Sequence, residues 1–183
     1  MRGMETAMNR VVNDAFVFAL EAHRGQVRKD GKPYISHPFA VAMELAQNGA
    51  EPELIAAGLL HDTIEDAGIT PEEIRDKFGD EVLRIVQFDT EDKACSWKER
   101  KTKTLNDLKN CDRKCAMLIC ADKLANIRDI EEDIRKNGEA IWECFKVSKN
   151  EQEWLYREYC TVFQKLSDLK MYEDLKNTVK TVF

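Results

Sequence analysis

The segment Leu54-Ile-Ala-Ala-Gly-Leu-Leu-His-Asp-Thr-Ile-Glu-Asp66 is the most informative part of the sequence. Its first half is almost entirely apolar, which predicts a buried helix that begins near Glu51-Pro52 and runs to about Asp66. His61 and Asp62 come late in this apolar run, where burying unpaired polar groups is costly. An imidazole beside a carboxylate suits a divalent cation such as Mn²⁺, Fe²⁺ or Zn²⁺. The stretch therefore predicts a core helix and a metal site together.

The acidic residues that follow strengthen this interpretation. Glu65 lies four positions after His61, and Asp66 lies four positions after Asp62. On a helix these four side chains crowd one end. Acidic groups placed so closely repel one another unless a cation or a shared proton intervenes.

A second carboxylate interrupts another apolar helix. Asp122 follows the apolar run 116–121, and Asn126 lies one turn later on the same face. Taken singly, Asp122 or His61 could be structural, and Lys123 or Arg128 could pair with Asp122. The case for a metal site therefore depends on the coincidence of these groups with His37-Pro38, each on an expected helix.

Apolar residues recur at helical spacing almost throughout the chain, which predicts an all-α protein. We expect one compact domain of about eight to ten helices over residues 1–183. Its motif-bearing core would span 14–130, and helices within 139–183 would pack on it. Ser36 resembles an N-cap with Pro38 in the first turn of a helix, and Thr70-Pro-Glu-Glu73 matches a capping box before a helix that ends at Gly79.

Composition excludes several classes of protein. The chain has 183 residues and a formal net charge of −6, which argues against a general nucleic-acid binder. No apolar stretch approaches the roughly 18 residues of a membrane-spanning helix. The segment 1–10 is mostly polar and lacks the apolar core of a signal peptide. We therefore expect a cytoplasmic protein without a membrane or nucleic-acid partner.

Three segments of the sequence resemble the RelA/SpoT-type hydrolases of the HD-domain superfamily. Ala22-His-Arg-Gly-Gln-Val-Arg-Lys-Asp-Gly-Lys-Pro-Tyr-Ile-Ser-His-Pro38 is similar to their opening motif. Gly58-Leu-Leu-His-Asp-Thr-Ile-Glu-Asp66 resembles their HDxxED motif, and Cys120-Ala-Asp-Lys-Leu-Ala-Asn-Ile-Arg128 resembles their closing motif. The chain is similar to the short, stand-alone, Mesh-type alarmone hydrolases.

The resemblance implies a metal-dependent (p)ppGpp 3′-pyrophosphohydrolase, an alarmone-degrading enzyme of the stringent response that acts as a phosphoric diester hydrolase. It implies Mn²⁺ as the cofactor. It assigns the metal ligands to His37, His61, Asp62 and Asp122. It assigns Glu65 and Asp66 to the pair that orients and activates the attacking water. It matches Arg28, Lys29 and Asn126 to residues that contact the nucleotide. Asp129 departs from the pattern, because the long enzymes tend to carry Thr at this position. The difference affects the expected nucleotide contacts near Arg128 and leaves the expected metal ligands unchanged.

Binding the highly charged substrate requires cations. Arg24, Arg28 and Lys29, with Lys32, lie close in sequence to His37 and are the favoured source. The charged helix near 98–103 is more typical of a solvated face. Tyr34 is a further candidate substrate contact, either stacking on the base or anchoring the turn in the core. The motifs specify the reaction class better than the base, so NADPH, an adenosine alarmone or a nucleoside monophosphate are alternative substrates. A homodimer is left open.

Overall fold

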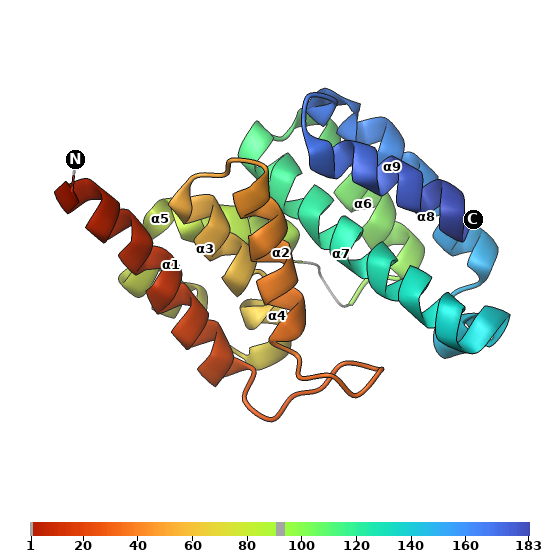
Figure 1. Ribbon diagram of the computed structural model, residues 1–183, viewed down its shortest axis with the longest axis horizontal. Coiled ribbons are helices and arrows are strands. Elements are labelled where there is room, and N and C mark those ends of the chain that lie inside the picture. The colour runs from red at the N-terminus through yellow and green to blue at the C-terminus, as the bar shows by residue number, and fades with distance from the viewer. Residues whose placement is uncertain (1, 91–93) are drawn as a thin grey trace. The chain divides into compact units, whose positions relative to one another are not determined.

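Helices make up most of the chain that the structure describes (Figure 1). The structure is a computed structural model that describes residues 2–90 and 94–183, with side chains from Arg10 onward. Met1, which begins the polar segment 1–10, lies outside the described residues. Over the described ranges there are nine α-helices, two short 3₁₀ helices and one isolated bridge between Val27 and Pro33. The prediction of an all-α fold of eight to ten helices is confirmed.

The chain divides into two compact units, Met1–Asp92 and Lys93–Phe183. The expectation of a single domain over 1–183 stays a prediction.

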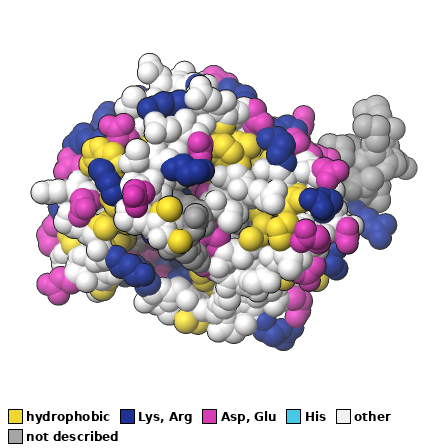
Figure 2. Space-filling view, turned by 180° about the vertical axis from the view of Figure 1, so that it is seen from behind, with side chains coloured by type: hydrophobic (Ala, Val, Ile, Leu, Met, Phe, Trp, Pro, Cys, Tyr) yellow, Lys and Arg dark blue, Asp and Glu magenta, His cyan; other side chains and the backbone are white. Residues whose placement is uncertain are grey.

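No helix in the described residues is long and apolar enough to cross a membrane. On the face drawn in Figure 2, Lys and Arg side chains are interspersed with Asp and Glu.

The first unit is built around one short apolar helix. Its helices are α1 (Arg2–Ala22), α2 (Ser36–Gln47), α3 (Pro52–Leu60), α4 (Thr63–Ala67) and α5 (Pro71–Asp89). Helix α3 packs against α1, α2 and α5. Most of its apolar residues are buried, as the sequence predicts for a core helix, and Ile55 is half-buried. The buried ones are Leu54, Ala56, Ala57, Leu59 and Leu60.

Helices α2 and α3 approach closely at Gly58. A Cβ atom added there would lie 2.7 Å from Leu45 Cδ1 and 3.4 Å from Ala42 Cα. The Leu45 methyl group would have to move to make room for a side chain at Gly58, so the glycine lets the two helices pack closely here.

The predicted helix from Leu54 to Asp66 is in fact two helices. Helix α3 ends at Leu60, α4 begins at Thr63, and His61 and Asp62 form the turn between them. The Thr63 hydroxyl is fully buried and donates to the Leu60 carbonyl at 2.7 Å. Since the last carbonyls of a helix have no partner within it, this bond stabilises the break.

Other helix ends show where sequence signals were accurate. The capping box at Thr70 is present, and Gly79 (φ 86°) kinks α5 where the sequence predicts a helix end. Ser36 does not cap α2, because its hydroxyl donates to the Pro33 carbonyl at 2.8 Å and the cap position falls on Ile35. That prediction was wrong, since the Ser36 side chain closes the preceding turn instead.

The second unit is arranged around a long helix. Its elements are α6 (Trp97–Asn110), α7 (Arg113–Asn137), η1 (Gly138–Cys144), α8 (Lys149–Val162), η2 (Phe163–Leu166) and α9 (Lys170–Val182). Helix α7 packs on α9, and α8 packs on α6 and α9. The segment 115–122 of α7 is buried at every position. Asp122 is therefore a carboxylate at the end of an apolar run, as the sequence predicts.

Candidate metal and nucleotide site

His61 stands at the C-terminal end of α3 with its ring held in one orientation. The side chain is 2% exposed, and its Nδ1 lies 2.8 Å from the Gly58 carbonyl. A carbonyl can only accept, so Nδ1 carries the proton and Nε2 of the neutral ring offers a lone pair. Metal-binding histidines are oriented by such a bond in the same way.

His37 brings a second imidazole to the same place from the first turn of α2. It is 5% exposed, and its ring centroid is 5.1 Å from that of His61. Asp62 supplies a carboxylate, because its Oδ2 lies 3.3 Å from His61 Nε2 and 3.7 Å from His37 Nε2. Two imidazole nitrogens and a carboxylate oxygen thus converge within the first unit.

Tyr34 closes the side of this cluster. Its hydroxyl lies 2.8 Å from Asp62 Oδ2 and 2.9 Å from Asp66 Oδ2. Burial raises the pKa of Tyr34 far above its ordinary value, and the neighbouring Asp62 and Asp66 raise it further. The phenol therefore remains neutral and acts as a hydrogen-bond donor to carboxylates.

Helix α4 carries the two acidic residues that follow the His-Asp pair. Glu65 is half-buried and Asp66 is exposed. The Asp66 backbone amide bonds to the Asp62 carbonyl at 2.9 Å, which continues the turn into α4. The structure thus brings Asp62, Asp66 and Tyr34 together and places Glu65 on the same short helix.

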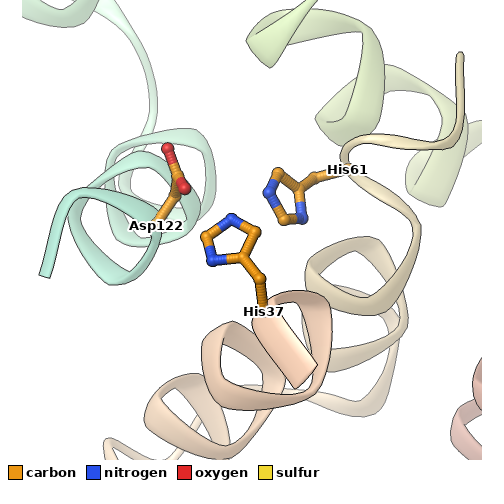
Figure 3. A group of neighbouring side chains, drawn as sticks. All are labelled: His37, His61 and Asp122. Atoms are coloured by element: carbon orange, nitrogen blue, oxygen red, sulfur yellow. The ribbon is translucent and has the colours of Figure 1, made fainter. Parts of the chain in front are cut away.

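Asp122 lies in the second unit and is itself buried, at 4% exposed. Asn126 Nδ2 donates to its Oδ1 at 2.6 Å, and the Lys123 ammonium pairs with its Oδ2. The expected neighbour one turn along α7 therefore contacts Asp122. His37, His61 and Asp122 each carry a side-chain atom of a kind that binds metal ions (Figure 3).

The donor set fits a divalent transition metal. Figure 3 shows the His37 and His61 rings turned toward each other, one from α2 and one from the end of α3. Imidazole and carboxylate ligands together suit Mn²⁺, Fe²⁺ or Zn²⁺, and they do not by themselves distinguish among these ions. The coarse expectation of a metal-binding group is supported, whereas the identity of the ion is a separate question.

The candidate substrate residues fall in several places. Arg24 and Tyr34 line a cavity of about 420 Å³ together with His23 and the apolar Leu20, Val27 and Ile35. Arg24 is exposed and paired with Glu21. Arg28 and Lys29 lie in the turn that the Val27–Pro33 bridge closes, and the Arg28 amide bonds to the Lys32 carbonyl at 2.9 Å.

Sequence reasoning missed three residues that support the site. They are Thr63, which holds the break after the His-Asp pair, and His23 and Gln26, which contact Tyr34 and Asp66. His23 and Gln26 were visible only as part of the opening motif, without a role. No sequence pattern indicated a role for Thr63. Its hydroxyl stabilises the break between α3 and α4, and the sequence did not predict that break.

Comparison with known proteins agrees with the fold and the motifs. The HD domain family matches residues 15–168. A Danio rerio protein named guanosine-3′,5′-bis(diphosphate) 3′-pyrophosphohydrolase MESH1 is 40% identical over 131 residues, which cover 69% of this chain and 73% of that protein. The Homo sapiens protein of the same name is 38% identical over 121 residues, covering 64% of this chain and 68% of that one.

Two solved structures share the fold. A Listeria monocytogenes EGD-e protein has a TM-score of 0.76 and 32% identity, over 80% of this chain and 98% of that one. A metazoan ortholog of SpoT, described as hydrolysing ppGpp, has a TM-score of 0.75 and 22% identity, over 94% of this chain and 93% of that one. The His-Asp pair, the matched residues 15–168 and these relatives together show that the chain belongs to the HD-domain family.

Proposed function

We propose that this protein is a metal-dependent (p)ppGpp 3′-pyrophosphohydrolase that yields GDP or GTP and pyrophosphate. The observation that carries the proposal is the cluster of His37, His61 and Asp62, in which Asp62 Oδ2 lies 3.3 Å and 3.7 Å from the two Nε2 atoms. The MESH1 relatives, which are named for this activity, supply the substrate class.

Four side chains would hold the ion: His37, His61, Asp62 and Asp122. The first three come from the first unit, and we propose that Asp122 of α7 is the fourth ligand. Mn²⁺ is the proposed ion, on the resemblance of the motifs. When bound, a divalent ion supplies Lewis acidity and lowers the pKa of a bound water.

The remaining chemistry belongs to the chain. Asp66 is held by the Tyr34 hydroxyl at 2.9 Å, and Glu65 stands beside it on α4. We assign these two carboxylates to orienting the attacking water and accepting its proton. Water attacks the phosphorus next to the ribose 3′-oxygen, the bond between them breaks, and the 3′-oxygen leaves and takes up a proton.

The substrate carries several negative charges, and the acidic pair cannot bind it. We assign that role to Arg24, Arg28 and Lys29, which lie between α1 and α2. Tyr34 lines the same cavity as Arg24, and its ring is the candidate contact to the base. Asn126 is the proposed contact from α7. A cytoplasmic location, and the absence of membrane and nucleic-acid partners, are further parts of this proposal, and a homodimer stays untested.

The direct test is to incubate the purified protein with ppGpp and Mn²⁺ and to separate the products by anion-exchange chromatography. We expect GDP and pyrophosphate in equal amounts. Glu65→Gln and Asp66→Asn should abolish turnover, whereas Glu72→Gln, an exposed acidic residue on α5, should retain it. Absence of turnover with any divalent ion would overturn the proposal.

A substrate panel distinguishes the alternatives within the same reaction class. The cluster binds an ion without reading a base, so NADPH, an adenosine alarmone and nucleoside monophosphates belong in the panel. Faster turnover of one of these than of ppGpp would replace the proposed substrate and keep the proposed chemistry. Binding of nucleotides without turnover of any of them would indicate a non-catalytic module.

A further inference from the structure

The hydroxyl of Tyr34 contacts two carboxylates with different proposed roles. It lies 2.8 Å from Oδ2 of Asp62 and 2.9 Å from Oδ2 of Asp66. A phenol has one proton to donate, so the two oxygens share a single donor. This arrangement fixes both carboxylates relative to one atom.

The contacted atom of Asp62 is the one that faces the histidines. The same Oδ2 lies 3.3 Å from His61 Nε2 and 3.7 Å from His37 Nε2. A donor on this oxygen limits rotation of the carboxylate. Carboxylates that bind metal ions are oriented by such outer hydrogen bonds, and removing them weakens metal binding.

The Tyr34 ring is itself held in place from the end of α1. It stacks on the buried ring of His23 with centroids 4.6 Å apart and an interplanar angle of 21°. His23 Nδ1 lies 2.8 Å from Gln26 Oε1, and Gln26 Nε2 donates to the Asp66 carbonyl at 2.8 Å. Because the Gln26 amide nitrogen faces a carbonyl, its oxygen is the acceptor, and His23 Nδ1 carries the proton.

These bonds form a continuous path. The Tyr34 amide also donates to the Gln26 carbonyl at 3.0 Å, so the turn, the ring and the backbone of α4 are joined at Gln26. We infer that Tyr34 is a positioning residue, which holds Asp62 Oδ2 toward the two histidines and holds Asp66 beside it, while His23 and Gln26 fix Tyr34. This inference rests on the proposed function and gives Tyr34 a role other than stacking on the base.

A purely structural role would have a different signature. A half-buried phenol needs hydrogen-bond partners, and losing them alters the free energy of unfolding. It would alter neither the affinity for a metal ion nor the rate constant at saturating metal and substrate. Metal affinity measured without nucleotide therefore separates the two roles.

The test uses Tyr34→Phe, which keeps the ring and its stacking on His23 and removes only the hydroxyl. Mn²⁺ binding to the metal-free protein is measured by isothermal titration calorimetry. We expect the dissociation constant to rise about 10- to 100-fold. At saturating Mn²⁺ we expect kcat for ppGpp to fall and KM to change little, because Asp66 loses the hydrogen bond from the Tyr34 hydroxyl.

Tyr172→Phe is the matched control. Its hydroxyl donates to the Cys160 carbonyl at 3.2 Å in the second unit. This variant loses a hydrogen-bonded phenol without touching a proposed ligand, so Mn²⁺ affinity and kcat should equal those of the wild type. Equal affinity and kcat in Tyr34→Phe would overturn the inference.

Two further outcomes are distinguishable. Should Tyr34→Phe fail to fold by circular dichroism, Gln26→Met tests the same path, and unchanged metal affinity in that variant would also overturn the inference. A wild-type protein that binds Mn²⁺ but does not hydrolyse ppGpp would defeat the proposed function alone, since the weaker Mn²⁺ binding of Tyr34→Phe would still support its positioning role.

Discussion

Replacing Thr63 with valine tests how the break between α3 and α4 is stabilised. Valine keeps the shape of the side chain and removes the hydroxyl that donates to the Leu60 carbonyl at 2.7 Å. Thr63 is fully buried and Leu60 is the last residue of α3, so the carbonyl loses a partner that the helix cannot supply. Leaving a buried acceptor unsatisfied costs about 1–3 kcal/mol.

We therefore expect Thr63→Val to lower the free energy of unfolding by about 1–3 kcal/mol. The measurement is urea unfolding of the metal-free protein, followed by far-ultraviolet circular dichroism. Thr178→Val is the matched control. Its hydroxyl donates to the Asp174 carbonyl at 2.9 Å within α9, where the helix already supplies a partner. That variant should stay within about 0.5 kcal/mol of the wild type.

Equal stability of Thr63→Val and the wild type would show that the Thr63 hydroxyl does not stabilise the break. Thr63→Ser provides a second check, because it keeps the hydroxyl and loses one methyl group. We expect Thr63→Ser to retain the Mn²⁺ affinity of the wild type, whereas Thr63→Val should weaken it by loosening the turn that carries His61 and Asp62. The opposite order would show that the methyl group, rather than the hydrogen bond, holds the turn.

Three further predictions concern the ion, the pH dependence and a helix cap. Adding Mn²⁺ at 100 times its dissociation constant should stabilise the wild type by about 2.7 kcal/mol, seen as a higher Tm, and His61→Ala should remove that increase. Three helix-capping glutamates, Glu73, Glu99 and Glu151, accept hydrogen bonds from Thr70, Ser96 and Ser148, which lower the pKa of each glutamate below its ordinary 4.5. The stabilisation of the folded state by these ionised glutamates is therefore present above pH 4.5 and is lost as pH falls through their pKa values in the folded protein. A variant with glutamine at all three positions should therefore lose less stability on acidification than the wild type in a pH series of thermal melts. The Asp112 side chain caps α7, so Asp112→Ala should cost about 1 kcal/mol in urea unfolding and Asp112→Asn much less.

The sequence predicts the helices well because their signals are local. The capping box at Thr70, the kink at Gly79 and the apolar run of α7 each depend on neighbours within a few residues. The break at His61-Asp62 was missed because helical spacing continues through it, and the local bond from Thr63 to the Leu60 carbonyl has no distinct signature in the sequence. The prediction for Ser36 failed because its hydroxyl donates to the Pro33 carbonyl instead of capping α2.

The candidate ligands could be found from sequence because few residue types serve as ligands and the chain has only three histidines. The contacts that orient these ligands could not be found from the sequence. Tyr34 reaches Asp62 across 28 positions and Gln26 reaches Asp66 across 40, and no local pattern encodes contacts over such separations. The sequence indicates Tyr34 as a candidate residue of the site, but only the structure shows that its hydroxyl contacts Asp62 and Asp66.

The close approach at Gly58 matters for any attempt to change which ion the protein prefers. His37 lies in α2 and His61 at the end of α3. Because Gly58 has no Cβ atom, these two helices pack closely at that position. The packing of the two helices that carry the imidazoles thus involves a position that contributes no ligand. Selection for altered metal preference should therefore begin with paired substitutions at Gly58 and Ala42, leaving the ligands in place.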